Sequence, residues 1–154
     1  MSVRTGRCQC HAIQYELTGE PLFVHACHCT LCQQRSGSAY GLTMIIEARQ
    51  FRLTHGSLAT VELTADSGNI KHSHFCADCG SPVTGTMPTT PILAGLRPGT
   101  LDDTSWFTVG AHIWVKSKQP WIRLPGDIPC FEVDYVRETV WPQSSLQRLK
   151  DLVK

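Results

Sequence analysis

The stretch Cys27-His28-Cys29-Thr30-Leu31-Cys32 places three thiols within six positions, as a CxC step and a CxxC step that share their middle cysteine. Zinc readily accepts thiolate ligands, and three protein ligands leave a tetrahedral ion one open position, which is typical of a catalytic zinc site. Neighbouring side chains of an extended segment point apart, so the CxC pair converges only in a bent loop. The stretch therefore predicts a metal-binding loop with three thiolates. The alternative is a structural site that takes its fourth ligand from elsewhere.

Two further pairs of closely spaced cysteines lie outside this stretch. Cys8-Gln9-Cys10 is a second CxC step, and Cys76-Ala77-Asp78-Cys79-Gly80 is a CxxC step whose glycine relieves a tight turn. Four thiolates complete a closed structural zinc site, so we expect these two pairs to share one ion. Other groupings of the seven cysteines remain open on arithmetic alone. The predicted structural site comprises Cys8, Cys10, Cys76 and Cys79, and the predicted catalytic site comprises Cys27, Cys29 and Cys32.

Length and composition limit the classes of protein. A chain of 154 residues suits one domain with its own core, and we expect residues 1–154 to form a single domain. The formal net charge of +1, without a basic run, argues against nucleic acid or a membrane surface as partner. No apolar run approaches the roughly 20 residues of a spanning helix, and the N-terminus lacks a signal-peptide core. We therefore expect a cytoplasmic protein, in which clustered cysteines indicate metal binding or catalysis.

Short alternating stretches separated by turn residues predict a mainly β domain. The expected strands lie at 12–17, 22–24, 39–46, 51–54, 57–63, 70–75, 82–87 and 92–96, with weaker alternation over 106–115. A polar loop is expected at 33–38. Only the tail is predicted to be helical, with Ser144-Ser145 as the cap and an apolar face that packs on the sheets. That face comprises Leu146, Leu149, Leu152 and Val153.

The histidines near the cysteine motifs are predicted to have structural roles or to be exposed. His28 lies between two predicted ligands, and a residue in that position often points away from the metal. We expect the others to be exposed to solvent or hydrogen-bonded in the core, and none of them is identified as a general base. These others are His25, His72, His74 and His112.

Four other side chains are candidates for supporting roles. Asp102 and Asp103 are expected to cap or brace a turn, with a contact to a zinc ligand as the alternative. Arg35 is either a surface charge or a partner for a substrate carboxylate, which suits the fork of its guanidinium group. Cys130, beside Pro129, is expected to be a small buried hydrophobe.

Five motifs follow one another in order along the chain. They are Gly6-Arg7-Cys8-Gln9-Cys10, the 27–32 stretch with Arg35-Ser36-Gly37-Ser38, Phe75-Cys76-Ala77-Asp78-Cys79-Gly80-Ser81, Gly99-Thr100-Leu101-Asp102-Asp103, and His112-Ile113-Trp114 followed by Pro120-Trp121. As an ordered set they resemble the glutathione-dependent formaldehyde-activating enzymes, which share a domain with centromere protein V. The resemblance covers about residues 6–132 and leaves 133–154 as a C-terminal extension.

The resemblance implies an Mss4-like fold of several coiled antiparallel sheets stabilised by zinc. It also implies the two metal sites described above, with two Zn²⁺ ions per chain. His11 departs from the family pattern, because glycine usually follows the CxC step. Leu96-Arg97-Pro98 also departs from it, by interrupting the usual run into the Gly-Thr-Leu-Asp-Asp motif.

The chemistry of three thiolates on zinc points to thiol substrates. Such an ion is a weak Lewis acid, better suited to exchanging a thiolate ligand than to making hydroxide, and a thiol bound to it becomes a nucleophile. With the resemblance, this predicts a zinc-dependent carbon–sulfur lyase that joins glutathione, or a related thiol, and a small aldehyde such as formaldehyde. The alternatives are a non-catalytic zinc-binding scaffold of the same fold and a nucleic-acid-associated domain, against which the near-neutral charge weighs.

Overall fold

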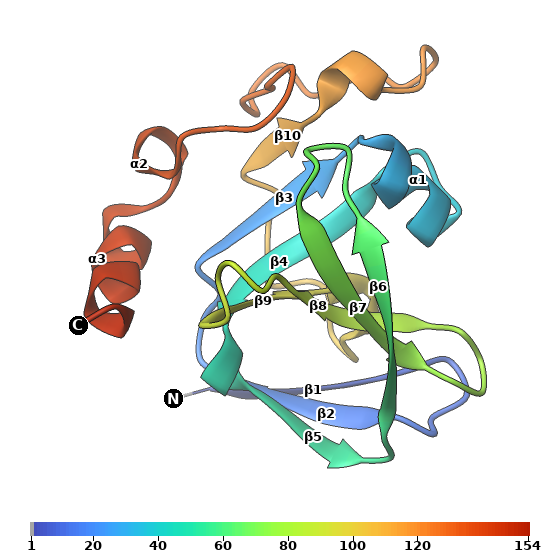
Figure 1. The fold of residues 1–154 in the computed structure, drawn as a ribbon. Helices are drawn as coiled ribbons and strands as arrows, with labels where there is room; N and C mark the ends of the chain where they lie inside the picture. Colours follow the sequence, from blue (N-terminus) through green and yellow to red (C-terminus); the bar gives the residue numbers. More distant parts are fainter. Residues whose placement is uncertain (1) are drawn as a thin grey trace.

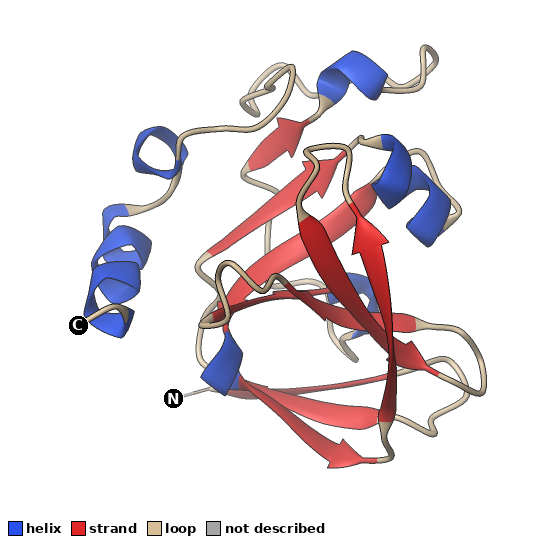
Figure 2. Ribbon diagram, in the orientation of Figure 1, coloured by secondary structure: helices blue, strands red, loops and turns tan. Residues whose placement is uncertain are grey.

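Two β-sheets form the body of the protein (Figures 1 and 2), which a computed structural model describes for residues 2–154. The smaller sheet has the strand order β1-β2-β5 and the larger sheet has the order β10-β3-β4-β9-β8-β7-β6. All pairings between these strands are antiparallel except that of β10 with β3. The prediction of a mainly β fold with antiparallel sheets and a short C-terminal helix is therefore confirmed.

The strand bounds match most of the predicted stretches. They are β1 Val3–Arg7, β2 Gln14–Thr18, β3 Phe23–Cys27, β4 Gly41–Glu47, β5 Phe51–His55, β6 Leu58–Thr64, β7 Ile70–Cys76, β8 Pro82–Thr86, β9 Leu93–Leu96 and β10 Ala111–Ile113. The helices are α1 Thr30–Ser36, α2 Arg137–Val140 and α3 Gln143–Leu152, with short 3-10 turns at η1 Ala48–Gln50, η2 Pro98–Thr100 and η3 Val115–Ser117. None of the helices in the described chain has the length and apolar character needed to span a membrane.

The main core lies between the two sheets. On β2 the side chains of Tyr15 and Leu17 are buried, because alternate residues of a strand face the same side. They meet Met44 and Ile46 of β4. A Cβ atom built on Gly6 would lie 2.3 Å from the ring of Tyr15, so glycine is required at the start of the first motif.

Two sequence-based expectations about helices were wrong. The segment expected to be a loop at 33–38 is helical as far as Ser36, because Cys29 caps the N-terminus of α1 and Asp66, from a distant turn, accepts from its first amide group. In α3, Ser145 lies buried inside the helix instead of capping it, and Val153 is 72% exposed beyond its end. Of the weakly alternating stretch at 106–115, only β10 forms a strand.

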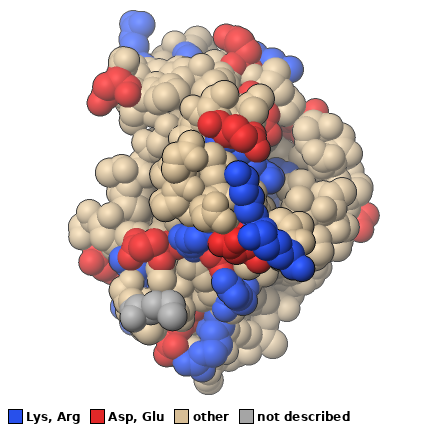
Figure 3. Space-filling model, turned by 90° about the vertical axis from the view of Figure 1, so that its left-hand side faces the viewer, with Lys and Arg blue, Asp and Glu red and all other residues tan. Residues whose placement is uncertain are grey.

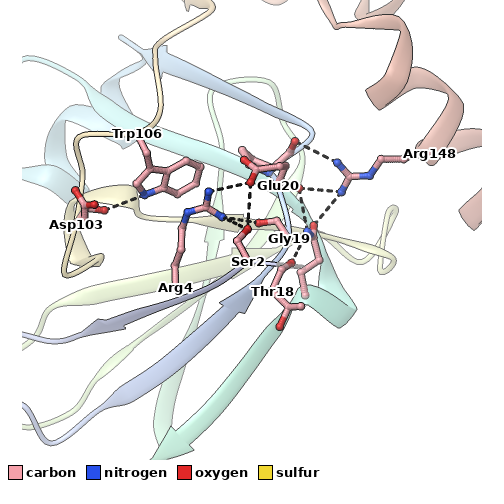
Figure 4. Close-up of polar contacts among 10 residues, drawn as sticks. Ser2, Arg4, Thr18, Gly19, Glu20, Asp103, Trp106 and Arg148 are labelled. Carbon is pink, nitrogen blue, oxygen red and sulfur yellow. Dashed lines mark hydrogen bonds and ion pairs between the residues drawn. The ribbon is translucent and has the colours of Figure 1, made fainter.

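The segment after β10 returns along one side of the body, where Figure 1 shows α2 and α3. Arg148 of α3 fixes it: Nη2 donates to the Glu20 carbonyl oxygen at 2.9 Å and Nε donates to Glu47 Oε1 at 2.9 Å. Glu20 also pairs at 2.8 Å with Arg4, which stacks 3.6 Å from the Trp106 ring (Figure 4). On this face, charges of both signs intermingle (Figure 3). The C-terminal segment is thus tied to the body by specific polar contacts.

Candidate metal centres

The first cysteine cluster joins the N-terminal loop to the turn between β7 and β8. The Sγ atoms of its four members all lie within 4.8 Å of one another. Cys8 Sγ is 3.5 Å from Cys10 Sγ, which is 3.7 Å from Cys76 Sγ. Thiolates bound tetrahedrally to zinc at roughly 2.3 Å lie about 3.8 Å apart, whereas a disulfide needs about 2.05 Å. The spacing of Cys8, Cys10, Cys76 and Cys79 therefore fits a tetrahedral metal ion.

Backbone conformation brings these thiols together. His11 follows the CxC step with φ of 66°, a left-handed conformation that explains why glycine suits this position, and Gly80 has φ of 74°. The Ile13 amide donates to Cys8 Sγ at 3.2 Å. Hydrogen bonds from Ser81 lower the pKa of Cys79 to about 5, which favours the thiolate. The loop is thus shaped to present thiolates to one point.

Asp102 and Asp103 brace loops, as expected. Asp102 pairs with Arg7 at 2.9 Å and accepts from Thr5 Oγ1 at 2.7 Å, which ties the loop after η2 to β1. Asp103 Oδ1 accepts from the Ser105 amide at 2.8 Å. Neither carboxylate accepts a hydrogen bond from a cysteine of the described chain. The alternative, a contact to a metal ligand, is not observed.

The second cluster lies where β3 runs into α1. Cys27, Cys29 and Cys32 are all buried, with Sγ atoms within 4.8 Å of one another. Cys29 is the N-cap of α1, and its Sγ accepts from the Cys32 amide at 3.4 Å. Asp66 holds the helix start in place, because its carboxylate accepts from the Thr30 amide at 2.9 Å. The three thiols therefore converge in a fixed bend, as the spacing predicts.

Charge in this cluster concentrates on one thiol. Hydrogen bonds from Cys27 and Cys29 lower the pKa of Cys32, and the positive charges of Arg97 and Lys71 act in the same direction. Hydrogen bonds within the cluster raise the pKa of Cys27, the one with Cys29 having the larger effect and the one with Cys32 the smaller. The arrangement favours negative charge on Cys32, because the pKa of Cys29 is raised as well, and a divalent cation would favour the thiolate at all three sulfurs.

A cavity of about 240 Å³ opens beside the second cluster and is lined by all three of its cysteines. Four cationic side chains also line the cavity, namely Arg35, Lys71, Arg97 and Arg137. Within residues 2–154, none of the four forms an ion pair with a carboxylate. The carboxylates of Asp66 and Asp134 line it as well. The cavity therefore offers four cations without ion-pair partners next to a thiol cluster.

Hydrogen bonds to neutral groups orient two of these cations. Arg35 Nη2 donates to Ser73 Oγ at 3.0 Å, while its Nε has no partner in the described chain. Arg97 Nη1 donates to Thr43 Oγ1 at 3.0 Å. Both guanidinium groups therefore retain unused donors for an anionic ligand, which favours the substrate-binding interpretation of Arg35.

Comparison with known proteins gives the family of the chain. The model of the family described as glutathione-dependent formaldehyde-activating enzyme matches residues 3–117, which include both cysteine clusters. The chain belongs to this family. A crystal structure of a Rhodobacter sphaeroides protein has a TM-score of 0.52 at 17% identity and covers 82% of this chain and 98% of its own, a likeness that concerns the fold alone. No curated protein gives a significant match.

Four histidines of this formaldehyde-activating family member are hydrogen-bonded and have lowered pKa values. His28 points away from the cysteines and shares a hydrogen bond of 2.9 Å with His112, and burial lowers the pKa of both rings. His74 contacts Thr60 and Thr86, as expected. Burial also lowers the pKa of His25, to about 4, although part of its side chain faces the cavity.

Several cavity residues were missed by sequence reasoning. Lys71 and Arg97 carry no local signal, because a lone cation on a strand or at its end is usually on the surface. His25 was considered only as an exposed or core residue. It lies two residues before Cys27 on β3, so strand periodicity could have predicted that both side chains share one face of the sheet. Cys130 is exposed, so the prediction that it is buried was wrong; its backbone pairs with His112 of β10 by a bridge, and the neighbouring Phe131 packs inward instead.

Proposed function

We propose that this protein is a zinc-dependent carbon–sulfur lyase that forms and cleaves the S-hydroxymethyl adduct of glutathione or a related thiol. The observation that carries the proposal is the three-cysteine cluster bordering a cavity lined by four cations. Membership of the glutathione-dependent formaldehyde-activating enzyme family points to the same class of reaction.

Two zinc ions per chain form part of this proposal. Cys8, Cys10, Cys76 and Cys79 would hold a structural ion in a closed site. Cys27, Cys29 and Cys32 would hold a second ion, which when bound supplies an open position for a thiol and favours its deprotonation. All eight cysteines are free thiols in the structure, which suits a reducing location such as the cytoplasm.

The cations of the cavity would select the thiol. Glutathione carries two carboxylates and one ammonium group besides its sulfur, so it is a net anion at neutral pH. Arg35, Lys71 and Arg97 would bind its carboxylates, since guanidinium groups make paired hydrogen bonds with them. Asp134, which lines the same cavity, would accept from the ammonium group. The side chains would thereby hold the sulfur beside the cysteine cluster.

The non-catalytic scaffold is the alternative within the same fold. A scaffold needs zinc for stability but has no need for a cavity next to the second cluster. The half-buried cations favour the enzyme, because guanidinium donors that have no carboxylate partner in the described chain are suited to binding an anionic ligand.

Exchange spectroscopy at equilibrium tests the reaction. Formaldehyde and glutathione combine spontaneously, so the measurement compares exchange rates between S-hydroxymethylglutathione and its components with and without protein. Serum albumin and the Cys29→Ser variant are the controls for simple thiol trapping. We expect faster exchange with the unmodified protein than with either control. A rate equal to that of the controls would remove formaldehyde activation and leave the scaffold.

A further inference from the structure

The C-terminal segment beyond the family-matched residues forms part of the wall of the cavity. Phe131 and Tyr135 pack directly against the cluster of Cys27, Cys29 and Cys32. The Tyr135 ring also meets Phe23 of β3 edge-on, with 5.4 Å between ring centroids. Farther along, the contacts of Arg148 anchor this segment to the body (Figure 4). Residues outside 3–117 are therefore placed to act on the cavity.

Two hydrogen bonds run from this segment to His25. Trp141 Nε1 donates to Tyr135 Oη at 3.1 Å, and Tyr135 Oη lies 3.0 Å from His25 Nδ1. An indole N–H can only donate, so the phenol oxygen accepts from Trp141, and within residues 2–154 the phenol hydrogen has His25 Nδ1 as its one acceptor. Nδ1 of His25 is then the acceptor, so the ring N–H lies on Nε2.

The other edge of the His25 ring has no partner. His25 and Cys27 lie two residues apart on β3, with side chains on one face of the sheet and Cα atoms roughly 7 Å apart. Both residues line the cavity. Nε2 of His25 makes no hydrogen bond with a cysteine or with any other residue of 2–154. An N–H donor is thus available beside the place where a thiol substrate would bind.

We propose that His25 Nε2–H donates a hydrogen bond to the oxygen of the aldehyde, and of the adduct in the reverse direction, and that Tyr135 is the positioning residue that fixes this tautomer. The inference rests on the proposed function. As the thiolate sulfur attacks the carbonyl carbon, a C–S bond forms and the π electrons of C=O move to oxygen. His25 stabilises this developing negative charge and keeps its own proton. The oxygen then takes a proton from water, while the proton of the thiol has passed to solvent.

The tautomer can be measured without any activity. Long-range ¹H–¹⁵N correlation spectra of zinc-loaded protein distinguish the two neutral tautomers from imidazolium, and the His25→Gln variant identifies the signal of His25. We expect Nε2–H in the unmodified protein and a mixture of tautomers in Tyr135→Phe, which keeps the ring but loses the hydroxyl. Tyr40→Phe is the matched control, since Tyr40 packs against His28 and His112 instead, and its spectrum should show His25 unchanged. An Nδ1–H ring or imidazolium in the unmodified protein, or no change in Tyr135→Phe, would overturn the proposal.

Exchange kinetics then separate this role from the proposed function. We expect His25→Leu to lower the exchange rate at saturating glutathione about 100-fold, with little change in the glutathione concentration at half-saturation. His25→Gln, whose amide N–H reaches about as far as Nε2, should restore part of the rate. Normal exchange in His25→Leu would overturn the role of His25 alone. No catalysed exchange in the unmodified protein would overturn the proposed function and this role with it.

Discussion

His28 Nε2 lies 2.9 Å from His112 Nδ1, and both rings are buried. The His28 amide also donates to the Ile113 carbonyl oxygen at 2.9 Å, so the bend that carries the second cysteine cluster is attached to β10 by side chain and backbone together. Because burial lowers the pKa of both rings, each is neutral, and one donates where the other accepts. The pair positions the bend without contacting the cysteine sulfurs.

Replacing His112 should loosen this bend. His112→Leu leaves His28 Nε2 buried without a partner, which costs about 1–3 kcal/mol in unfolding free energy. His112→Asn keeps a polar group near the position of Nδ1 and should lose less. Competition with a chromophoric chelator should show zinc affinity reduced about 10-fold at the second cluster and unchanged at the first. Equal zinc affinity in His112→Leu and in the unmodified protein would show that the pair does not support the cluster.

Elemental analysis should find two zinc ions per chain in protein purified without chelator. The spacing of both cysteine sets supports this expectation. The ion with three protein ligands should be removed first by a chelator, because a closed site with four thiolates contributes more to folding. Fully folded protein that contains no zinc would contradict both assignments.

Single substitutions should separate the two sites. Cys79→Ser removes a ligand from the closed site that joins the N-terminal loop to the β7–β8 turn, so we expect a large fall in melting temperature and poor folding. Cys29→Ser should leave the fold largely intact and abolish exchange activity. Thermal unfolding and circular dichroism of the two variants provide the comparison. A similar loss of stability in both variants would instead indicate two structural sites.

The sequence predicts features that depend on neighbouring residues and misses those that depend on distant ones. Cysteine spacing is local, so both groups of thiols could be assigned before their positions were known. The helical start at Thr30 could not be predicted, because besides the N-cap Cys29 it depends on Asp66, whose carboxylate accepts from the Thr30 amide from 36 residues away. The bond between His25 and Tyr135 spans 110 residues and depends on the path of the C-terminal segment. Ser145 has the chemistry of a cap, but packing placed it inside α3.

The cations of the cavity should distinguish thiols by charge. Arg97→Gln removes a positive charge beside the cysteine cluster, so we expect the glutathione concentration at half-saturation to rise about 10-fold, in line with the loss of one charged hydrogen bond. Cysteamine has a thiol but no carboxylate, and its half-saturation should not rise. Arg123→Gln is the matched control, because Arg123 is exposed and does not line the cavity. An equal effect on both thiols would point to a role in shaping the cluster rather than in binding carboxylates.

The attachment of α3 should depend on pH through Glu47. Burial favours the protonated form of this side chain, but hydrogen bonds from Arg49 and Arg148 outweigh burial and lower the pKa of Glu47. A carboxylate whose pKa is lower in the folded state stabilises the fold above its unfolded pKa of about 4.3, and this stabilisation is lost as pH falls through the folded value. Glu47→Gln should therefore cost about 2 kcal/mol in unfolding free energy near neutral pH, and the difference from the unmodified protein should shrink below about pH 4.

Denaturant unfolding of both proteins across this pH range tests the expectation, and taking the difference cancels any loss of zinc that the two share. Arg148→Met should lower stability in the same direction, because Arg148 Nε donates to Glu47 at 2.9 Å and its Nη2 also holds the Glu20 carbonyl. Arg148→Lys keeps the charge but loses the fork, so it should recover only part of the stability. A difference between Glu47→Gln and the unmodified protein that stays constant from neutral to acid pH would show that the charge of Glu47 does not hold α3 in place.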